Sequence, residues 1–387
     1  MYNVKELIIF LTIVLSVYFL GNFYIYKRAV QSLSLSGGSI WYFRIAFILI
    51  ILSFPLGRFL EAQFKGSPVN YVFYFVGSVW MGMMLYLILS ILLIDILRMV
   101  NHFVHFFPEY VTRDKTQSGR IAFYAVSSFT LIVMFYGFFN ARYIQTINVD
   151  VELEKLKTEK NPLSIVQISD VHLGKLITQE RLFTIAERVN ELNPDIVVIT
   201  GDLVDDSSAD LDDIVEPLKS IKTKFGKYFV SGNHDYFGNY EKVKTKVEES
   251  GVRILNNEYV VIDSAITLLG LDYLYGRKSN KDNRTIREML LGSDTSLPVV
   301  MLKHVPDALD KTVEAGIDLQ LSGHTHHGQL FPFNFITNQV YEISNGLGVY
   351  KSLQVYVNRG VGFWGPPARV GIPAEITKIN LKSNKKK

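Results

Sequence analysis

Long apolar stretches in the first 140 residues limit, more than any other feature, what this chain can fold into. A helix needs about 20 predominantly apolar residues to cross a bilayer. Four stretches reach that length: Glu6 to Tyr26, Trp41 to Leu60, Tyr71 to Leu97 and Ile121 to Asn140. The first has no small-residue cleavage pattern, so we expect an uncleaved helix and not a signal peptide. The sequence therefore predicts an all-α membrane domain of four transmembrane helices over residues 1–145.

Basic residues in the loops between these stretches indicate the direction of insertion. Lys and Arg are more frequent between the first two stretches, and between the third and fourth, than on the opposite side. Because loops rich in Lys and Arg stay in the cytoplasm, this asymmetry favours an extracytoplasmic position for both termini. We therefore expect a multi-pass protein of the cell membrane, with residues 146–387 outside the cytoplasm.

Composition excludes several kinds of chemistry. The chain contains no cysteine, which rules out disulfides, thiolate catalysis and thiolate zinc sites. A metal site would have to use His, Asp, Glu or Asn. The formal net charge is +3 and the basic residues are scattered, apart from the three lysines that end the chain, so nucleic acid is not an expected partner.

Residues 146–387 show the alternating pattern of an α/β domain. Ser164 to Ile168 reads as a strand and Asp195 to Thr200 as a buried strand, and Thr178 to Leu192 reads as an amphipathic helix between them. Further strands are expected at Lys227 to Val230, Pro298 to Lys303 and Leu319 to Ser322. Ligands in α/β folds gather beyond the carboxyl ends of such strands. The residues that follow them are therefore the candidates for a functional site.

Five of these strand ends are followed by side chains that commonly bind metals. They are Asp170 and His172 in SDVHLG, Asp202 in TGDLVD, Asn233, His234 and Asp235 in SGNHDY, His304 in LKHVP, and His324 and His326 in SGHTHHG. A single residue of this kind before a turn is usually a cap. Five of the six histidines in residues 146–387 occupy these positions, however, which chance does not explain. This mixture of carboxylate, imidazole and amide suits manganese, iron or zinc better than calcium.

The ordered pattern DxH, GD, GNH[DE], H, GHxH resembles the calcineurin-like metallophosphoesterase superfamily, including its bacterial membrane-associated members. The pattern is complete over Asp170 to His326. The resemblance implies a four-layer αββα sandwich, in which two mixed sheets pack face to face between helices. It also implies two divalent metal ions, with manganese, iron and zinc as the alternatives, and hydrolysis by a hydroxide that bridges them.

The resemblance also implies a role for each motif residue. The implied ligands are Asp170, His172 and His326 for one metal, Asn233, His304 and His324 for the other, and Asp202 bridging both. His234 corresponds to the catalytic histidine, which protonates the leaving oxygen. Asp235 matches the acidic position that follows it, where a hydrogen bond would orient His234.

Two features near the motifs keep two interpretations each. Asp205 and Asp206 follow the implied bridging aspartate. They either adjust the electrostatics of the metal site or are carboxylates of a surface loop. Arg359 precedes, and Arg369 lies in, a stretch rich in Gly and Pro from Gly360 to Pro373. These arginines either bind a phosphate or pack the loop.

Three functions agree with these observations. The favoured one is a membrane-anchored phosphoesterase with two metal ions that hydrolyses a phosphomonoester, phosphodiester or diphosphate. Its substrate could be lipid-linked, with UDP-diacylglucosamine or a phospholipid as the candidates. The second is a hydrolase of a soluble phosphoester, with the helices only as an anchor. The third is a non-catalytic membrane receptor or scaffold with a structural metal site, which would be expected to have lost ligands that are all present here. UDP-diacylglucosamine would require a cytoplasmic active site, against the expected topology.

Overall fold

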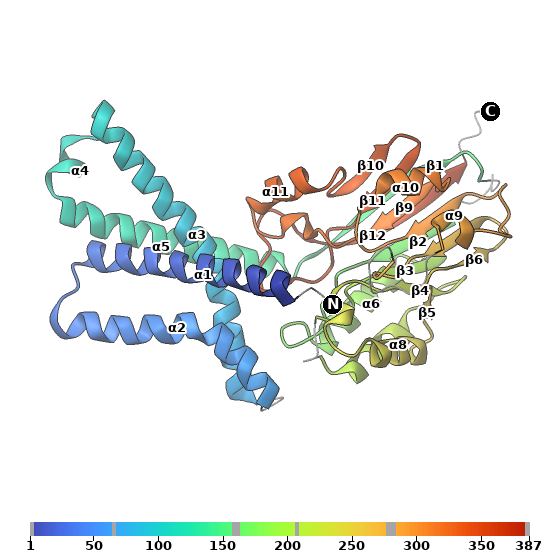
Figure 1. The fold of residues 1–387 in the computed structure, drawn as a ribbon, viewed down its shortest axis with the longest axis horizontal. Coiled ribbons are helices and arrows are strands. Elements are labelled where there is room, and N and C mark those ends of the chain that lie inside the picture. Colours follow the sequence, from blue (N-terminus) through green and yellow to red (C-terminus); the bar gives the residue numbers. More distant parts are fainter. Residues whose placement is uncertain (1–3, 64–66, 157–162, 206–208, 276–283, 384–387) are drawn as a thin grey trace. The chain divides into compact units, whose positions relative to one another are not determined.

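The computed structural model describes residues 4–63, 67–156, 163–205, 209–275 and 284–383. The chain forms two compact units, one of residues 1–138 with 365–368 and the other of residues 139–364 with 369–387. Figure 1 shows that the first unit is helical and that the second contains the sheets. The domain boundary after residue 145 stays a prediction.

The helical unit is built from long apolar helices. They are α1 (Val4–Leu33), α2 (Gly37–Gln63), α3 (Pro68–Val104), the short α4 (Glu109–Arg113) and α5 (Lys115–Asn140). Within the described residues, three segments are long and apolar enough to cross a membrane: Gly37–Leu60, Pro68–Val104 and Lys115–Asn140. The span expected from Glu6 to Tyr26 lies inside α1, and its crossing of a membrane stays a prediction.

Glycines let α2 and α3 approach each other closely. A Cβ at Gly77 of α3 would lie 2.3 Å from the backbone nitrogen of Phe54 in α2. A Cβ at Gly57 of α2 would lie 2.7 Å from the backbone nitrogen of Tyr74 in α3. Small residues at such positions bring the backbones of membrane helices into contact, where van der Waals packing holds the helices together.

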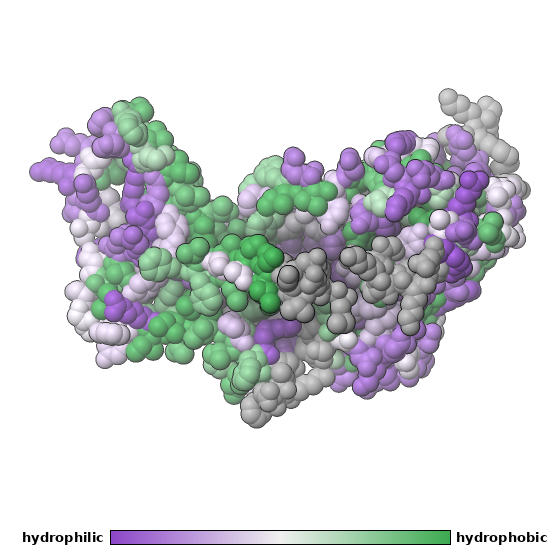
Figure 2. All heavy atoms as spheres, in the orientation of Figure 1, coloured by the Kyte–Doolittle hydropathy of each residue, from purple (hydrophilic) through white to green (hydrophobic). Residues whose placement is uncertain are grey.

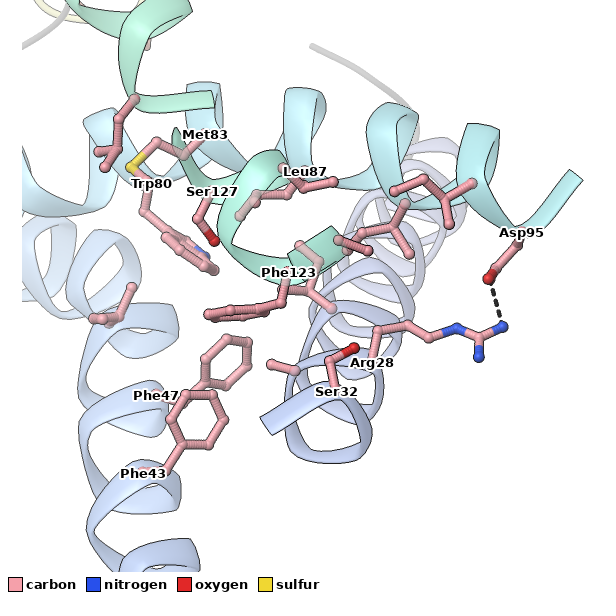
Figure 3. A pocket seen from close by; sticks show the side chains of 18 of the residues that line it. Arg28, Ser32, Phe43, Phe47, Trp80, Met83, Leu87, Asp95, Phe123 and Ser127 are labelled. Atoms are coloured by element: carbon pink, nitrogen blue, oxygen red, sulfur yellow. Dashed lines mark hydrogen bonds and ion pairs between the residues drawn. The ribbon is translucent and has the colours of Figure 1, made fainter. Parts of the chain in front are cut away.

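The helical unit also encloses a cavity of about 230 Å³. Apolar side chains, among them Phe43, Phe47 and Trp80, line most of it (Figure 3). At one end Arg28 forms an ion pair with Asp95, and Arg98 Nη1 lies 3.7 Å from the same carboxylate. The cavity is therefore apolar along its length and charged at one end.

Two six-stranded mixed sheets form the second unit, as the resemblance implies. The first sheet comprises, in order, β1 (Ile144–Leu153), β12 (Ala374–Ser383), β2 (Leu163–Ile168), β3 (Ile196–Thr200), β4 (Lys227–Val230) and β5 (Arg253–Ile254). The second comprises β10 (Gly346–Tyr350), β11 (Leu353–Val357), β9 (Leu319–Ser322), β8 (Val299–Leu302), β7 (Ile266–Gly270) and β6 (Glu258–Ile262). β2, β3 and β4 run parallel in the first sheet, and β7, β8 and β9 in the second.

Helices cover the sheets. They are α6 (Gln179–Glu191), α7 (Val215–Ser220), α8 (Tyr240–Glu249), α9 (Ile286–Met289), α10 (Leu309–Glu314) and α11 (Phe333–Val340). Among the residues that the structure describes, three single turns of 3-10 helix lie in the loops: η1 (Leu211–Ile214), η2 (His234–Tyr236) and η3 (His326–Gly328). Side chains that alternate along each strand enter different cores.

The cores separate the layers of this unit. Between the two sheets, Ile165 and Val198 of the first sheet pack in one cluster with Leu268 and Val300 of the second. On the other face of the first sheet, a second cluster joins Val166 and Val197 to Ile185 of α6. On the other face of the second sheet, a third joins Leu269 and Met301 to Leu309 of α10. The unit is a sandwich of two sheets with helices outside.

Candidate metal centre

The five predicted strand ends meet at one place. Asp170 and His172 follow β2, Asp202 follows β3, Asn233 and His234 follow β4, His304 follows β8, and His324 and His326 follow β9. Within the first sheet β2, β3 and β4 are parallel to one another, and within the second β8 and β9 are, so their carboxyl ends lie along shared edges. The site is thus assembled from both sheets.

The turns that carry these side chains hold a left-handed backbone. Five non-glycine residues of the site have positive φ: Asp170 at 53°, His172 at 53°, Asp202 at 51°, His324 at 71° and His326 at 46°. Each such conformation costs on the order of 1–3 kcal/mol. Backbone bonds between turns hold two of them, because Asp170 N–H donates to Gly201 at 3.0 Å and His172 N–H to Asp202 at 3.0 Å.

Gly201 is required for the approach of β3 to β8. Its φ is +90°, and a Cβ there would lie 2.5 Å from the Nδ1 atom of His304. A larger residue would therefore both strain the turn and displace the imidazole.

The first group of candidate ligands contains Asp170, His172 and His326. The two Nε2 atoms of His172 and His326 lie 3.0 Å apart, and His326 Nε2 lies 3.4 Å from Asp170 Oδ1. One donor atom from each residue lies within 4.8 Å of the others. All three side chains are buried. Buried lone pairs this close repel unless a proton or a cation lies between them, so the group fits a divalent metal ion.

The second group contains Asp202, His304 and His324, with Asn233 beside them. His304 Nε2 lies 3.2 Å from Asp202 Oδ2, from His324 Nδ1 and from Asn233 Oδ1. On its other side, His304 Nδ1 donates to the carbonyl of Thr200 at 2.7 Å. This bond leaves Nε2 as the atom with a free lone pair, which is the arrangement a metal-binding imidazole needs.

Asp202 lies between the two groups. Its Oδ2 atom is 3.2 Å from His304 Nε2 and 3.8 Å from His172 Nε2. Its other oxygen accepts the backbone N–H of His234 at 2.8 Å, which fixes the carboxylate in place. A single oxygen that faces both groups is the geometry expected of a ligand shared by two ions.

His234 lies at the edge of the first group. Its ring is 4.6 Å from the ring of His172, and its Nδ1 donates to the backbone carbonyl of Asp205 at 2.7 Å. The same nitrogen is 3.3 Å from the carboxylate of Asp205. Burial lowers the pKa of His234, but the hydrogen bond and charge of Asp205 and the charge of Asp202 outweigh it, so the pKa is raised above its ordinary value.

Asp205, and not Asp235, makes the orienting contact that we expected for His234. Asp235 is fully buried and accepts backbone N–H groups from Gly232 at 2.7 Å, from Asp202 and Leu203 at 3.0 Å, and from Val204 at 3.2 Å. It therefore ties the turn after β3 to the turn after β4. Both residues lie in η2, but their side chains have different partners.

The two late arginines pack the loop. Arg369 is fully buried and donates to the carbonyls of Gly362 at 2.7 Å and Arg359 at 2.8 Å. Its remaining contact is with His326 Nδ1 at 3.1 Å, on the side of the ring away from the candidate metal position. Arg359 forms an ion pair with Glu375. The geometry favours the packing interpretation over phosphate binding for both.

Comparison with known proteins decides the family. The profile of a family described as "Calcineurin-like phosphoesterase" matches residues 163–328. A Campylobacter jejuni protein named "Uncharacterized metallophosphoesterase Cj0846" is 30% identical over 384 residues, which cover 98% of this chain and 99% of that protein. This chain belongs to the calcineurin-like phosphoesterase family. Its members are metal-dependent hydrolases of phosphoesters, so the expected enzyme class is confirmed.

Two further relatives extend the comparison. The zebrafish "Transmembrane protein with metallophosphoesterase domain" is 35% identical over 266 residues, 65% of this chain and 61% of that protein. The Bacillus subtilis "Uncharacterized metallophosphoesterase YkuE" is 34% identical over 263 residues, 64% of this chain and 90% of that protein. A relative named as transmembrane and three apolar helices together indicate that this phosphoesterase is a membrane protein.

The sequence left the roles of two residues at this phosphoesterase site undecided. Asp205 lies 3.3 Å from both His172 Nδ1 and His234 Nδ1, so it acts on a candidate ligand and on the candidate catalytic residue together. Its position three residues after Asp202 was the available signal. Arg369 contacts His326 from 43 positions away, and no local pattern indicates that contact.

Proposed function

We propose that this phosphoesterase binds two divalent cations, one in each group, and hydrolyses a phosphoester or diphosphate bond between them and His234. The observation that carries the proposal is Asp202, whose Oδ2 atom faces His304 at 3.2 Å and His172 at 3.8 Å. Two cations, when bound, supply Lewis-acid activation of water and neutralise the phosphoryl oxygens. Manganese, iron and zinc all suit this donor set.

The protein's own side chains position the reaction. Both groups are held rigidly by buried side chains. Asp170, His304 and Arg369 are each hydrogen-bonded to a neighbouring turn or ring. His234 holds a proton at Nε2 for the leaving oxygen while its Nδ1 is bonded to Asp205. A general acid at this position accounts for about 10²–10⁴-fold of rate.

The surroundings of His234 favour a leaving group with an apolar part. Phe237 and Trp364 lie with ring centroids 4.6 and 5.9 Å from the imidazole. Both rings are more than half exposed, so they are available to a ligand. Together with the apolar helices, this supports a lipid-linked phosphoester such as a phospholipid or UDP-diacylglucosamine. A soluble substrate, with the helices as an anchor, is the alternative.

The test is hydrolysis by the full chain, reconstituted in detergent, of a chromogenic monoester, a chromogenic diester, a phospholipid and a nucleotide-diphospho-lipid. We expect metal-dependent turnover that is lost in Asp202→Asn and reduced about 10²–10⁴-fold in His234→Ala. Asp310→Asn and His102→Ala, both exposed and outside the site, serve as matched controls.

The outcomes separate the hypotheses. Turnover of the lipid substrates above the chromogenic ones supports the lipid-linked substrate, and the reverse order supports a soluble one. Tight metal binding with no turnover of any compound would instead favour a receptor or scaffold.

A further inference from the structure

α11 and the strand after it present an apolar surface on the second unit. None of the residues of α11 is buried. Six large apolar side chains there are 40–69% exposed, and we call them the apolar platform: Phe333, Phe335, Ile336, Val340, Leu347 and Val349. Figure 2 shows hydrophobic residues, in green, where Figure 1 places α11. Residues 331–350 contain one charged side chain, Glu342.

α11 directs its large apolar side chains outward, unlike a helix packed on a soluble domain. Two of its polar side chains contact the protein, since Asn334 Oδ1 is buried and Asn338 Oδ1 accepts Ser344 Oγ at 2.5 Å, whereas Gln339 is exposed. Phe335 and Ile336 turn outward instead and are 59 and 57% exposed. Soluble domains rarely expose a continuous apolar surface, and such a surface marks contact with a partner or a membrane.

Hydrogen bonds connect this surface to the point where the chain leaves a membrane-length helix. α5 ends at Asn140, whose Nδ2 donates to the carbonyl of Arg369 at 2.9 Å. The next residue, Val370, accepts the backbone N–H of Phe331 at 3.0 Å, and α11 begins at Phe333. All of these residues belong to the second unit.

We propose that the apolar platform docks onto the surface of the lipid bilayer, with its aromatic and aliphatic side chains among the headgroups. If α5 crosses the membrane, Asn140 lies at the membrane surface, and the bonds through Arg369 and Val370 bring Phe331, two residues before α11, close to it. Burying apolar side chains there is favourable, and phenylalanine is common on the lipid-facing side of interfacial helices. The near absence of charge means that docking desolvates few ionised groups.

Docking has a consequence for the metal centre. Thr325, between two candidate ligands, donates its hydroxyl to the carbonyl of Ser344 at 2.7 Å, and the ring of Tyr341 lies 6.1 Å from that of His324. The platform is thus tied to the loop after β9. If the proposed function is correct, a phosphoester at the bilayer surface reaches the site without leaving the membrane. The docking itself does not depend on that function.

Probes attached to single cysteines test the docking, because the chain has no cysteine of its own. Val349→Cys and, as control, the exposed Glu248→Cys are labelled with an environment-sensitive fluorophore in the full chain. The chains are reconstituted in phosphatidylcholine vesicles that carry a nitroxide quencher on the acyl chain. We expect quenching at position 349 to exceed that at position 248 several-fold. Equal quenching at the two positions would overturn the proposal.

A second variant identifies the occupant. Phe335→Asp with Ile336→Asp, in the Val349→Cys chain, is expected to reduce quenching to the level of the control. Leu291→Asp, at a residue 74% exposed beyond α9, is expected to leave it unchanged. Fluorescence that is shifted to the blue but unaffected by the lipid quencher would mean that a protein covers the platform, which would overturn bilayer docking. Quenching needs no turnover, so failure of the proposed hydrolysis leaves this result interpretable.

Discussion

At the scale of single residues, Asp205 links the two functions of the site. Its carboxylate lies 3.3 Å from an imidazole that is a candidate ligand and 3.3 Å from the imidazole proposed as general acid. A negative charge between two imidazoles favours their protonated or metal-bound forms. The raised pKa of His234 depends on this carboxylate.

We expect Asp205→Asn to move the alkaline limb of the pH–rate profile to lower pH. His234 must be protonated to act as an acid, and it loses its proton as the pH rises through its pKa. Removing the charge of Asp205 lowers that pKa, so activity is lost at a lower pH than in the natural protein. The measurement is the pH dependence of kcat, with Asp310→Asn as control. An unchanged alkaline limb would mean that Asp205 does not set the pKa of His234.

At the scale of elements, the close approach of α2 and α3 depends on glycine. A Cβ added at Gly77 would lie only 2.3 Å from the backbone of Phe54. The helices can meet this closely only because no side chain separates them.

We therefore expect Gly77→Leu to destabilise the helical unit by about 1–3 kcal/mol, because the side chain forces α2 and α3 apart. The measurement is the Tm of the full chain in detergent, followed by tryptophan fluorescence. Gly38→Leu is the matched control, since a Cβ at Gly38 meets nothing within 4 Å. Equal Tm values for the two variants would show that the close approach contributes no stability.

At the scale of the whole molecule, the metal groups join the two sheets. Side chains after β2, β3 and β4 of the first sheet meet side chains after β8 and β9 of the second. A cation held by both sheets stabilises the folded unit against the unfolded chain, because the unfolded chain offers no preformed site.

Removing metal is therefore expected to lower the Tm of the second unit. At a metal concentration 100 times the Kd, binding adds about 2.7 kcal/mol to the free energy of unfolding. For a unit of this size, that raises the Tm by roughly 5–10 °C. Differential scanning calorimetry with chelator and with manganese measures the shift. The Asp202→Asn variant should lose most of the metal-dependent shift in Tm, and the His102→Ala control should retain it. A Tm that does not respond to metal in the unsubstituted chain would contradict the proposed centre.

The sequence by itself determined the parts of this protein that depend on neighbouring residues. An apolar run followed by a polar turn, repeated along the chain, is enough to place Asp170, Asp202 and His304 at strand ends. Length and apolarity alone are likewise enough to predict membrane helices, of which three are confirmed as candidates by length and composition. The number of crossings and the side on which the site lies depend on a membrane that acts on the whole chain, so both stay predictions.

The tertiary structure decided which partner each side chain meets. Asp205 and Asp235 both stand beside motif residues, and only the path of the two turns shows that Asp205 contacts His234 while Asp235 accepts backbone amides. Arg369 reaches His326 only because its loop packs on the turn after β2. The outward direction of Phe335 in α11 was likewise hidden, since a helical period shows which residues share a face but not what that face meets.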